Sequence, residues 1–166
     1  MILQNGVIID FNYQAVGSGS GRKAFIDQTV NFGASDDPMK KADMAKVKRG
    51  VVQIPMVGGT IAFGYNKPGC NLKLTQEKAV LVAMGKIRNW KDLGCAPGTL
   101  VWVHRSDGSG TTKAFTNSMQ AFSSKWTLGT GKSVKWPAGV GAKGNSGVAA
   151  VIQNRVGAIG LSLIHI

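Results

Sequence analysis

Acidic residues are scarce in this chain of 166 residues, most of all in its second half. Eight aspartates and glutamates stand against 20 lysines and arginines, which gives a formal charge of +12, and no acid follows Asp107. A basic surface attracts anions, whether nucleic acid, acidic lipid or a small oxyanion. The lysines are spread singly, without arginine-glycine clusters or aromatic ladders, so the pattern argues against a nucleic-acid partner.

Histidine and cysteine are nearly absent as well, with two of each. Neither Cys70 nor Cys95 has a CxxC partner or a histidine at metal-binding spacing, which argues against zinc and thioredoxin-type chemistry. A Ser-His-Asp triad would need His104, but adjacent strand residues point to opposite faces, so His104 and Arg105 would diverge. The two cysteines are either buried thiols or a disulfide in an oxidising compartment, and we favour the disulfide.

Long apolar runs are also missing from the sequence. No stretch reaches the roughly 20 apolar residues that span a bilayer. The first ten residues, MILQNGVIID, lack the basic start and long apolar run of a signal peptide. We therefore expect either a cytoplasmic protein or a piece of a chain whose leader is missing.

Strand-like and helix-like patterns alternate along the chain. Strands are expected over 6–16, in the first part of 31–39 and over 99–105, with an extended run over 51–66. Helices are expected over 22–30, 39–49, 75–87, 111–126 and 148–155, and an irregular segment over 133–147. Asp36 or Asp37 is the expected N-cap of the second helix and Thr75 that of the third. This alternation predicts an α/β fold with a mostly parallel sheet.

Three glycine-rich loops, at 17–21, 107–112 and 139–147, each precede an expected helix. Unpaired N–H groups and partial positive charge at helix N-termini make an anion site where several converge. Two nucleotide motifs are incomplete. GTGKS at 129–133 imitates a P-loop but has Trp126 where glycine is required, and GVGAKG at 139–144 has no acid about 20 residues on for a ribose. Nucleotide and dinucleotide binding are therefore disfavoured.

The loop HRSDGSGTTKAF, residues 104–115, combines the groups that an oxyanion site needs. Arg105 offers a planar pair of donors, and Asp107 either holds that guanidinium or caps the next helix. Residues 109–111 supply hydroxyl and backbone donors. A carboxylate from Asp36 would accept a proton that phosphate retains at neutral pH and sulfate lacks, and so discriminate between them. From the pattern alone, a plain N-cap is the favoured role of Asp36.

Four stretches carry a family resemblance: YQAVGSGSGRKAFIDQTVNFGASDDPM, GKIRNW, VHRSDGSGTTKAF and VKWPAGVGAKGNSGVAAVIQ followed by GAIG. They resemble successive blocks of the periplasmic phosphate-binding proteins that serve high-affinity phosphate ABC importers, from about Asn12 to Gly160. RSDGSGTT with FGASD upstream is specific to that family. The resemblance implies an incomplete type II periplasmic-binding-protein fold, a two-lobed Venus flytrap. It also implies a monomeric, non-enzymatic periplasmic protein without metal or cofactor, which captures inorganic phosphate and passes it to a membrane permease.

The resemblance also implies a ligand set for phosphate. Its members, matched position by position, are Ser18, Asp36, Arg105, Asp107, Ser109, Gly110 and Thr111. Asp36 stands where the family has its proton acceptor, and Asp107 stands as the partner of Arg105. A phosphate-handling enzyme or phosphatase-associated protein on the same scaffold is the alternative.

The ends of the chain depart from the family. Nothing before Asn12 resembles the glycine-rich loop with which the family begins, so we expect a partial lobe one over 1–62 and a partial lobe two over 63–160. The last six residues, LSLIHI, match the translation of a common sequencing adapter, so we predict that 161–166 are an artefact and base no expectation about the fold on them. With a ligand loop missing, the 166 residues alone are expected to bind phosphate weakly or not at all.

Overall fold

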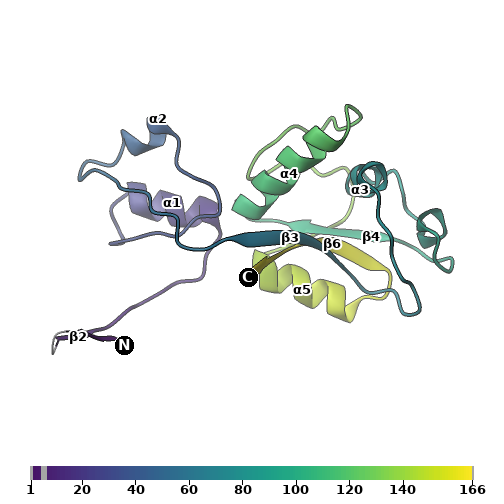
Figure 1. The fold of residues 1–166 in the computed structure, drawn as a ribbon, viewed down its shortest axis with the longest axis horizontal. Coiled ribbons are helices and arrows are strands. Elements are labelled where there is room, and N and C mark those ends of the chain that lie inside the picture. The colour runs from purple at the N-terminus through teal and green to yellow at the C-terminus, as the bar shows by residue number, and fades with distance from the viewer. Residues whose placement is uncertain (1, 5–6, 166) are drawn as a thin grey trace.

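The computed structural model describes residues 2–4 and 7–165 (Figure 1). Its elements in chain order are β1 (Ile2–Gln4), β2 (Val7–Ile9), α1 (Ser18–Ile26), α2 (Lys41–Met44), β3 (Gly59–Tyr65), α3 (Gln76–Ala83), the 3-10 helix η1 (Trp90–Leu93), β4 (Val101–Arg105), α4 (Gly110–Phe122), β5 (Val140–Ala142), α5 (Gly144–Asn154) and β6 (Ala158–His165). Within the described part, no helix is both long and apolar enough to cross a membrane.

Four strands form the main sheet, in the order β3-β6-β4-β5. Strand β4 runs parallel to both β5 and β6, whereas β3 lies antiparallel to β6 at one edge. The expected α/β fold with a mostly parallel sheet is therefore confirmed. β1 and β2 form a separate antiparallel hairpin.

Helices cover both faces of the main sheet (Figure 1). Helices α3 and α4 lie on one face and α5 on the other. The side chains of β4 alternate between the two faces of the sheet, so this strand contacts the helices on both sides. Trp102 is buried in the cluster that includes Phe115 of α4, and Val103 is buried in the cluster that includes Val148 of α5. The same alternation fixes the direction of Arg105 at the end of the strand.

Helices α1 and α2 lie beside the sheet rather than within its layers, at the end where α4 begins (Figure 1). Two expected strands of this segment are wrong. Regular strand covers only Val7–Ile9 of 6–16, and residues 31–39 contain none. Within the described part of the chain, residues 10–16 and 31–39 have no hydrogen-bonded neighbouring strand. Phe11 and Phe32 of these segments instead pack edge to face, with ring centroids 6.2 Å apart.

Helix boundaries were predicted with mixed success. Thr75 caps α3 as expected, because its side chain accepts a hydrogen bond from the N–H of Lys78. The expected cap of α2 is wrong, because Lys40 occupies that position without a side-chain bond, and the two aspartates before it are engaged elsewhere. Helix α1 starts four residues earlier than predicted, at Ser18, and the segment predicted as irregular contains β5 and the start of α5.

Strand β6 continues beyond Gly160 into the last six residues. Leu161 pairs with Phe63 of β3, and its side chain is fully buried in the core. These residues therefore take part in the sheet as far as His165, and Ile166 lies outside the described residues. Their origin as an adapter stays a prediction. The lobe division also stays one, and Ala62, where we expected it, lies within β3 opposite Ser162.

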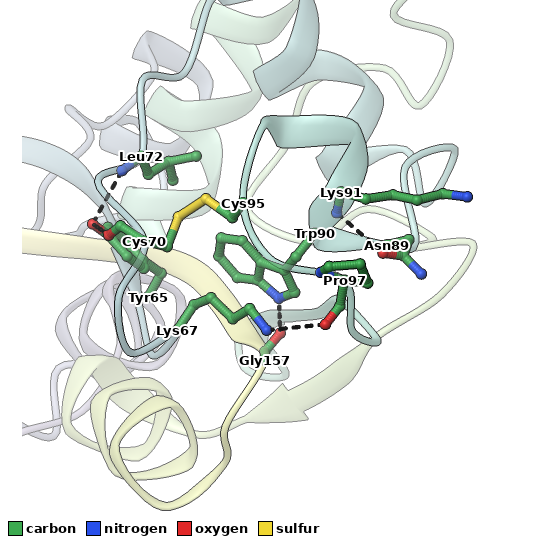
Figure 2. The surroundings of a disulfide bond; sticks show 10 residues. All are labelled: Tyr65, Lys67, Cys70, Leu72, Asn89, Trp90, Lys91, Cys95, Pro97 and Gly157. Atoms are coloured by element: carbon green, nitrogen blue, oxygen red, sulfur yellow. Dashed lines mark hydrogen bonds between the residues drawn. A yellow bond between two sulfur atoms is a disulfide. The ribbon is translucent and has the colours of Figure 1, made fainter.

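A disulfide joins Cys70, in the loop after β3, to Cys95, just after η1 (Figure 2). The same loops are held by further bonds. The hydroxyl of Tyr65 donates to the carbonyl of Cys70 at 2.9 Å, and the indole N–H of Trp90 donates to the carbonyl of Gly157 at 3.0 Å. The structure thus contains the disulfide that we favoured over two buried thiols. It fastens the end of the sheet that lies away from α1 (Figure 1).

Candidate functional site

Each of the three glycine-rich loops opens a helix, and the three helix starts meet. The N–H of Gly19, in the first turn of α1, donates to the carbonyl of Gly108 at 2.8 Å, just before α4. The N–H of Gly144, the first residue of α5, donates to Oδ1 of Asp107 at 3.1 Å. The N-termini of three helices therefore meet around residues 107–110. Helix N-termini carry partial positive charge, so this arrangement is suited to an anion.

Arg105 ends strand β4 and points toward α5. Its side chain is only 5% exposed, and Nε and Nη2 donate to the two carboxylate oxygens of Asp107 at 2.6 Å each. Nη1 donates to Oδ1 of Asn145, the second residue of α5, at 2.9 Å. A guanidinium has five N–H donors, so these three bonds hold it in place and leave two N–H groups for a ligand.

Asp107 is an ionised partner for that guanidinium. The pKa of Asp107 is lowered from 3.8 to about 2, chiefly by the hydrogen bond from Arg105 and also by that from the N–H of Gly144, against the opposing effect of burial. The carboxylate therefore stays charged at any physiological pH and keeps Arg105 oriented.

The other side of the cluster is built by Ser18, Asp36 and the start of α4. The N–H of Asp36 donates to Oγ of Ser18 at 3.2 Å, and the hydroxyl of Thr111 donates to Oδ2 of Asp36 at 3.1 Å. A Cβ on Gly110 would lie 2.5 Å from Oγ of Ser18 and 2.8 Å from Cβ of Asp36, so only glycine allows this close approach. The N-terminal segment and the sheet thus meet through these four residues.

Ser109 is the N-cap of α4, and it leaves donors beside that meeting point. Its Oγ accepts from the N–H of Thr112 at 3.0 Å, and its carbonyl accepts from the N–H of Lys113. The N–H groups of Gly110 and Thr111 have no acceptor among the described residues. They can therefore donate to a bound oxyanion without losing a bond of the helix.

All seven residues of the expected ligand set lie in this cluster, while their role as phosphate ligands stays a prediction. His104 does not join them, because its ring stacks on Trp136 with centroids 5.2 Å apart, on the opposite face of β4 from Arg105. Among the described residues, no three His, Cys, Asp or Glu side chains gather as a metal site would require. Sequence reasoning missed Asn145, although it lies in the third glycine-rich loop that the reasoning had singled out.

Comparisons with known proteins agree on one family. A family model described as a PBP superfamily domain matches residues 5–165. The phosphate-binding protein PstS of Pasteurella multocida is 43% identical over 157 residues, which cover 86% of this chain and 45% of the relative. PstS of Haemophilus influenzae is 42% identical over 164 residues, covering 90% and 48%. The chain thus spans about half the length of these curated relatives.

A solved structure gives the corresponding match in three dimensions. It is a high-affinity periplasmic phosphate-binding protein (PfluDING) bound with phosphate, which superposes with a TM-score of 0.79 at 22% identity and covers 96% of this chain and 50% of that one. This likeness supports the fold.

Proposed function

Since the chain belongs to the PBP superfamily, we propose that its cluster of helix starts binds inorganic phosphate. One observation carries the proposal: a carboxylate acceptor, Asp36, stands among donors. It accepts the hydroxyl of Thr111 beside the unpaired N–H groups of Gly110 and Thr111. The two remaining N–H groups of Arg105 complete the donors. A fully deprotonated anion would meet repulsion at the carboxylate, whereas an anion that carries a proton can donate that proton to it.

Phosphate fits this mixed set better than sulfate does. At neutral pH phosphate retains at least one proton and sulfate retains none. A site built on hydrogen bonds disfavours a ligand that leaves its polar groups unpaired. Asp36 is itself an exposed residue in this structure, where its carboxylate is held by the hydroxyl of Thr111. Asp36 is therefore assigned the role of proton acceptor, and Ser18, Arg105 and residues 109–111 the role of donors. Asp107 acts through Arg105.

We further propose that the protein captures phosphate without chemical change and delivers it to the membrane permease of a phosphate ABC importer. The names of the relatives support phosphate binding. The periplasm is the proposed compartment, and the disulfide between Cys70 and Cys95 fits an oxidising environment. The placement of His104 against Trp136 offers no support for the enzymatic alternative. The segment carrying α1 and α2 would belong to one lobe, and the four-stranded sheet with its helices to the other.

Calorimetric titration with phosphate and sulfate tests the assignment. It should be done on the parent protein, meaning the longest natural chain that contains residues 1–160. We expect binding of phosphate with strong preference over sulfate, and an Asp36→Asn variant that loses most of this preference. Asp43→Asn is the matched control, because Asp43 is an acid on α2 whose ion-pair partner among the described residues is Lys46 of the same segment.

Two results would contradict these assignments separately. If the parent protein failed to bind phosphate, or bound sulfate equally well, the proposed function would be wrong. If phosphate binding were strong and its preference over sulfate survived Asp36→Asn unchanged, only the acceptor role of Asp36 would fall.

A further inference from the structure

Asp37, the neighbour of Asp36, forms ion pairs with basic side chains from both sides of the site. Nη2 of Arg22, on α1, lies 2.7 Å from its Oδ2, and Nζ of Lys132, in the loop after α4, lies 3.5 Å from the same oxygen. The side chains of Lys132 and Asp37 are 23% and 22% exposed, so solvent screens this pair less than it screens a surface ion pair. The contact joins the segment that carries Asp36 to the unit that carries the phosphate-donor loop.

Lys132 is tied to that donor loop through its main chain. Its carbonyl accepts the N–H of Ser109 at 2.9 Å. The residue before it, Gly131, donates its N–H to Oγ1 of Thr116 in α4 at 3.2 Å. One residue is therefore fixed at both ends, by its backbone to the cap of α4 and by its ammonium group to Asp37. It therefore connects the start of α4 with the residue that follows Asp36.

A hollow of about 280 Å³ lies beside the cluster, and it too is lined by residues from both sides of the site. Helix α1 lines it with Gly19, Arg22 and Lys23, and the α2 region with Asp43 and Lys46. Lys132 is the residue that reaches the same hollow from the loop after α4.

The charges around the cluster depend on Lys132. The set has three carboxylates, those of Asp36, Asp37 and Asp107, and three cations. Arg22 and Lys132 pair with Asp37, and Arg105 pairs with Asp107. The set is formally neutral with Lys132 and negative without it. Since opposite charges at this distance interact appreciably when partly shielded from water, losing the ammonium would leave Asp37 less completely neutralised beside the anion site.

We propose that Lys132 is a positioning residue for anion binding. By pairing with Asp37 it neutralises that carboxylate, and through Asp37 it holds the neighbouring Asp36 in place relative to Ser109, Gly110 and Thr111. This inference rests on the proposed binding of phosphate and adds a residue to that site without making it a ligand. Neither the glycine-rich loops nor the chain's overall charge singles Lys132 out, since it lies 95 positions after Asp37 in the sequence.

A double-mutant cycle on phosphate affinity tests the role. Phosphate dissociation constants are measured by calorimetry for the parent protein, Lys132→Gln, Asp37→Asn and the double variant. We expect Lys132→Gln to weaken phosphate binding about five- to tenfold, in the usual range for coupled sites. The same change made in the Asp37→Asn background should cost less than about twofold, because Lys132 acts through Asp37. Lys132→Arg should restore most of the affinity.

Lys23→Gln is the matched control for charge. It removes the same charge beside the same hollow, but Lys23 pairs with Asp27 of its own helix, so we expect a change of less than about twofold. Thermal unfolding of every variant separates loss of positioning from loss of folding, and Lys132→Gln should weaken binding even where the melting temperature is unchanged.

The outcomes distinguish this inference from the proposed function. A parent protein that binds no phosphate would overturn both. Phosphate binding that is unaffected by Lys132→Gln would overturn the positioning role alone. An equal loss in both backgrounds would also overturn it, since Lys132 would then act on the ligand by its charge and not through Asp37.

Discussion

Gly110 is a residue at which the two sides of the site come very close. A Cβ at this position would lie 2.5 Å from Oγ of Ser18, so we expect Gly110→Ala to push α1 and α4 apart and to weaken phosphate binding about tenfold or more. Gly147→Ala is the control, because that helical glycine has its nearest contact at an ordinary 3.6 Å. Phosphate affinities of the two variants, measured by titration, check the expectation. Equal affinities would show that the close approach at Gly110 has no part in binding.

Asp107 links the site to the acid stability of the protein. Its pKa is about 2 in the folded protein, below the ordinary value of 3.8, chiefly because Arg105 hydrogen-bonds to the ionised form. A carboxyl whose pKa is lowered by folding stabilises the folded state above its ordinary pKa, and this contribution is lost as the pH falls through the folded value. We therefore expect the free energy of unfolding to fall between about pH 4 and pH 2, and to fall less in Asp107→Asn. Denaturant titrations over this range measure the difference, and parallel curves for the two proteins would contradict the assignment.

The loop after β3 and the 3-10 helix η1 are stabilised by one covalent bond at the scale of elements. Cys70 and Cys95 are 25 positions apart, and closing a loop of that length stabilises a fold by about 3 kcal/mol. We expect a double Cys70→Ser, Cys95→Ser variant to lose about that free energy of unfolding. Phosphate affinity should change less than about twofold, because the bond lies at the end of the sheet away from α1. A variant that kept its stability, or that lost binding while still folded, would show that the two ends are not independent.

Elements with a strong local pattern could be predicted from the sequence, and those that depend on distant partners could not. Strand β4 and the cap of α3 by Thr75 are set by local spacing and chemistry, and both are confirmed. The expected strand over 6–16 has suitable residues but no neighbouring strand beyond β1, so most of it stays irregular. Asp37 has the chemistry of a helix cap, but Arg22 and Lys132 pair with its carboxylate.

At the scale of the whole molecule, the site was predictable where its residues are contiguous. Arg105 to Thr111 lie in one loop, and their residue types alone indicate an oxyanion site. Ser18 and Asp36 required the family resemblance, because nothing local connects them to that loop. Neither the local pattern nor the family resemblance pointed to Asn145 and Lys132. Their contacts with Arg105 and Asp37 form only when the fold brings distant segments together.

The long separations between partners in the cluster determine when it can form. Thr111 follows Asp36 by 75 positions and Asn145 follows Arg105 by 40, so large loops must close before these bonds exist. Contacts between distant residues form slowly, and during synthesis α1 emerges well before α4 and α5 have been made. Phe11 and Phe32, which remain about half exposed even in the finished structure, are then open to non-native contacts. A ligand that binds only the completed cluster would draw the population toward the native state, so the abundance of that ligand would influence how much of the newly made chain folds.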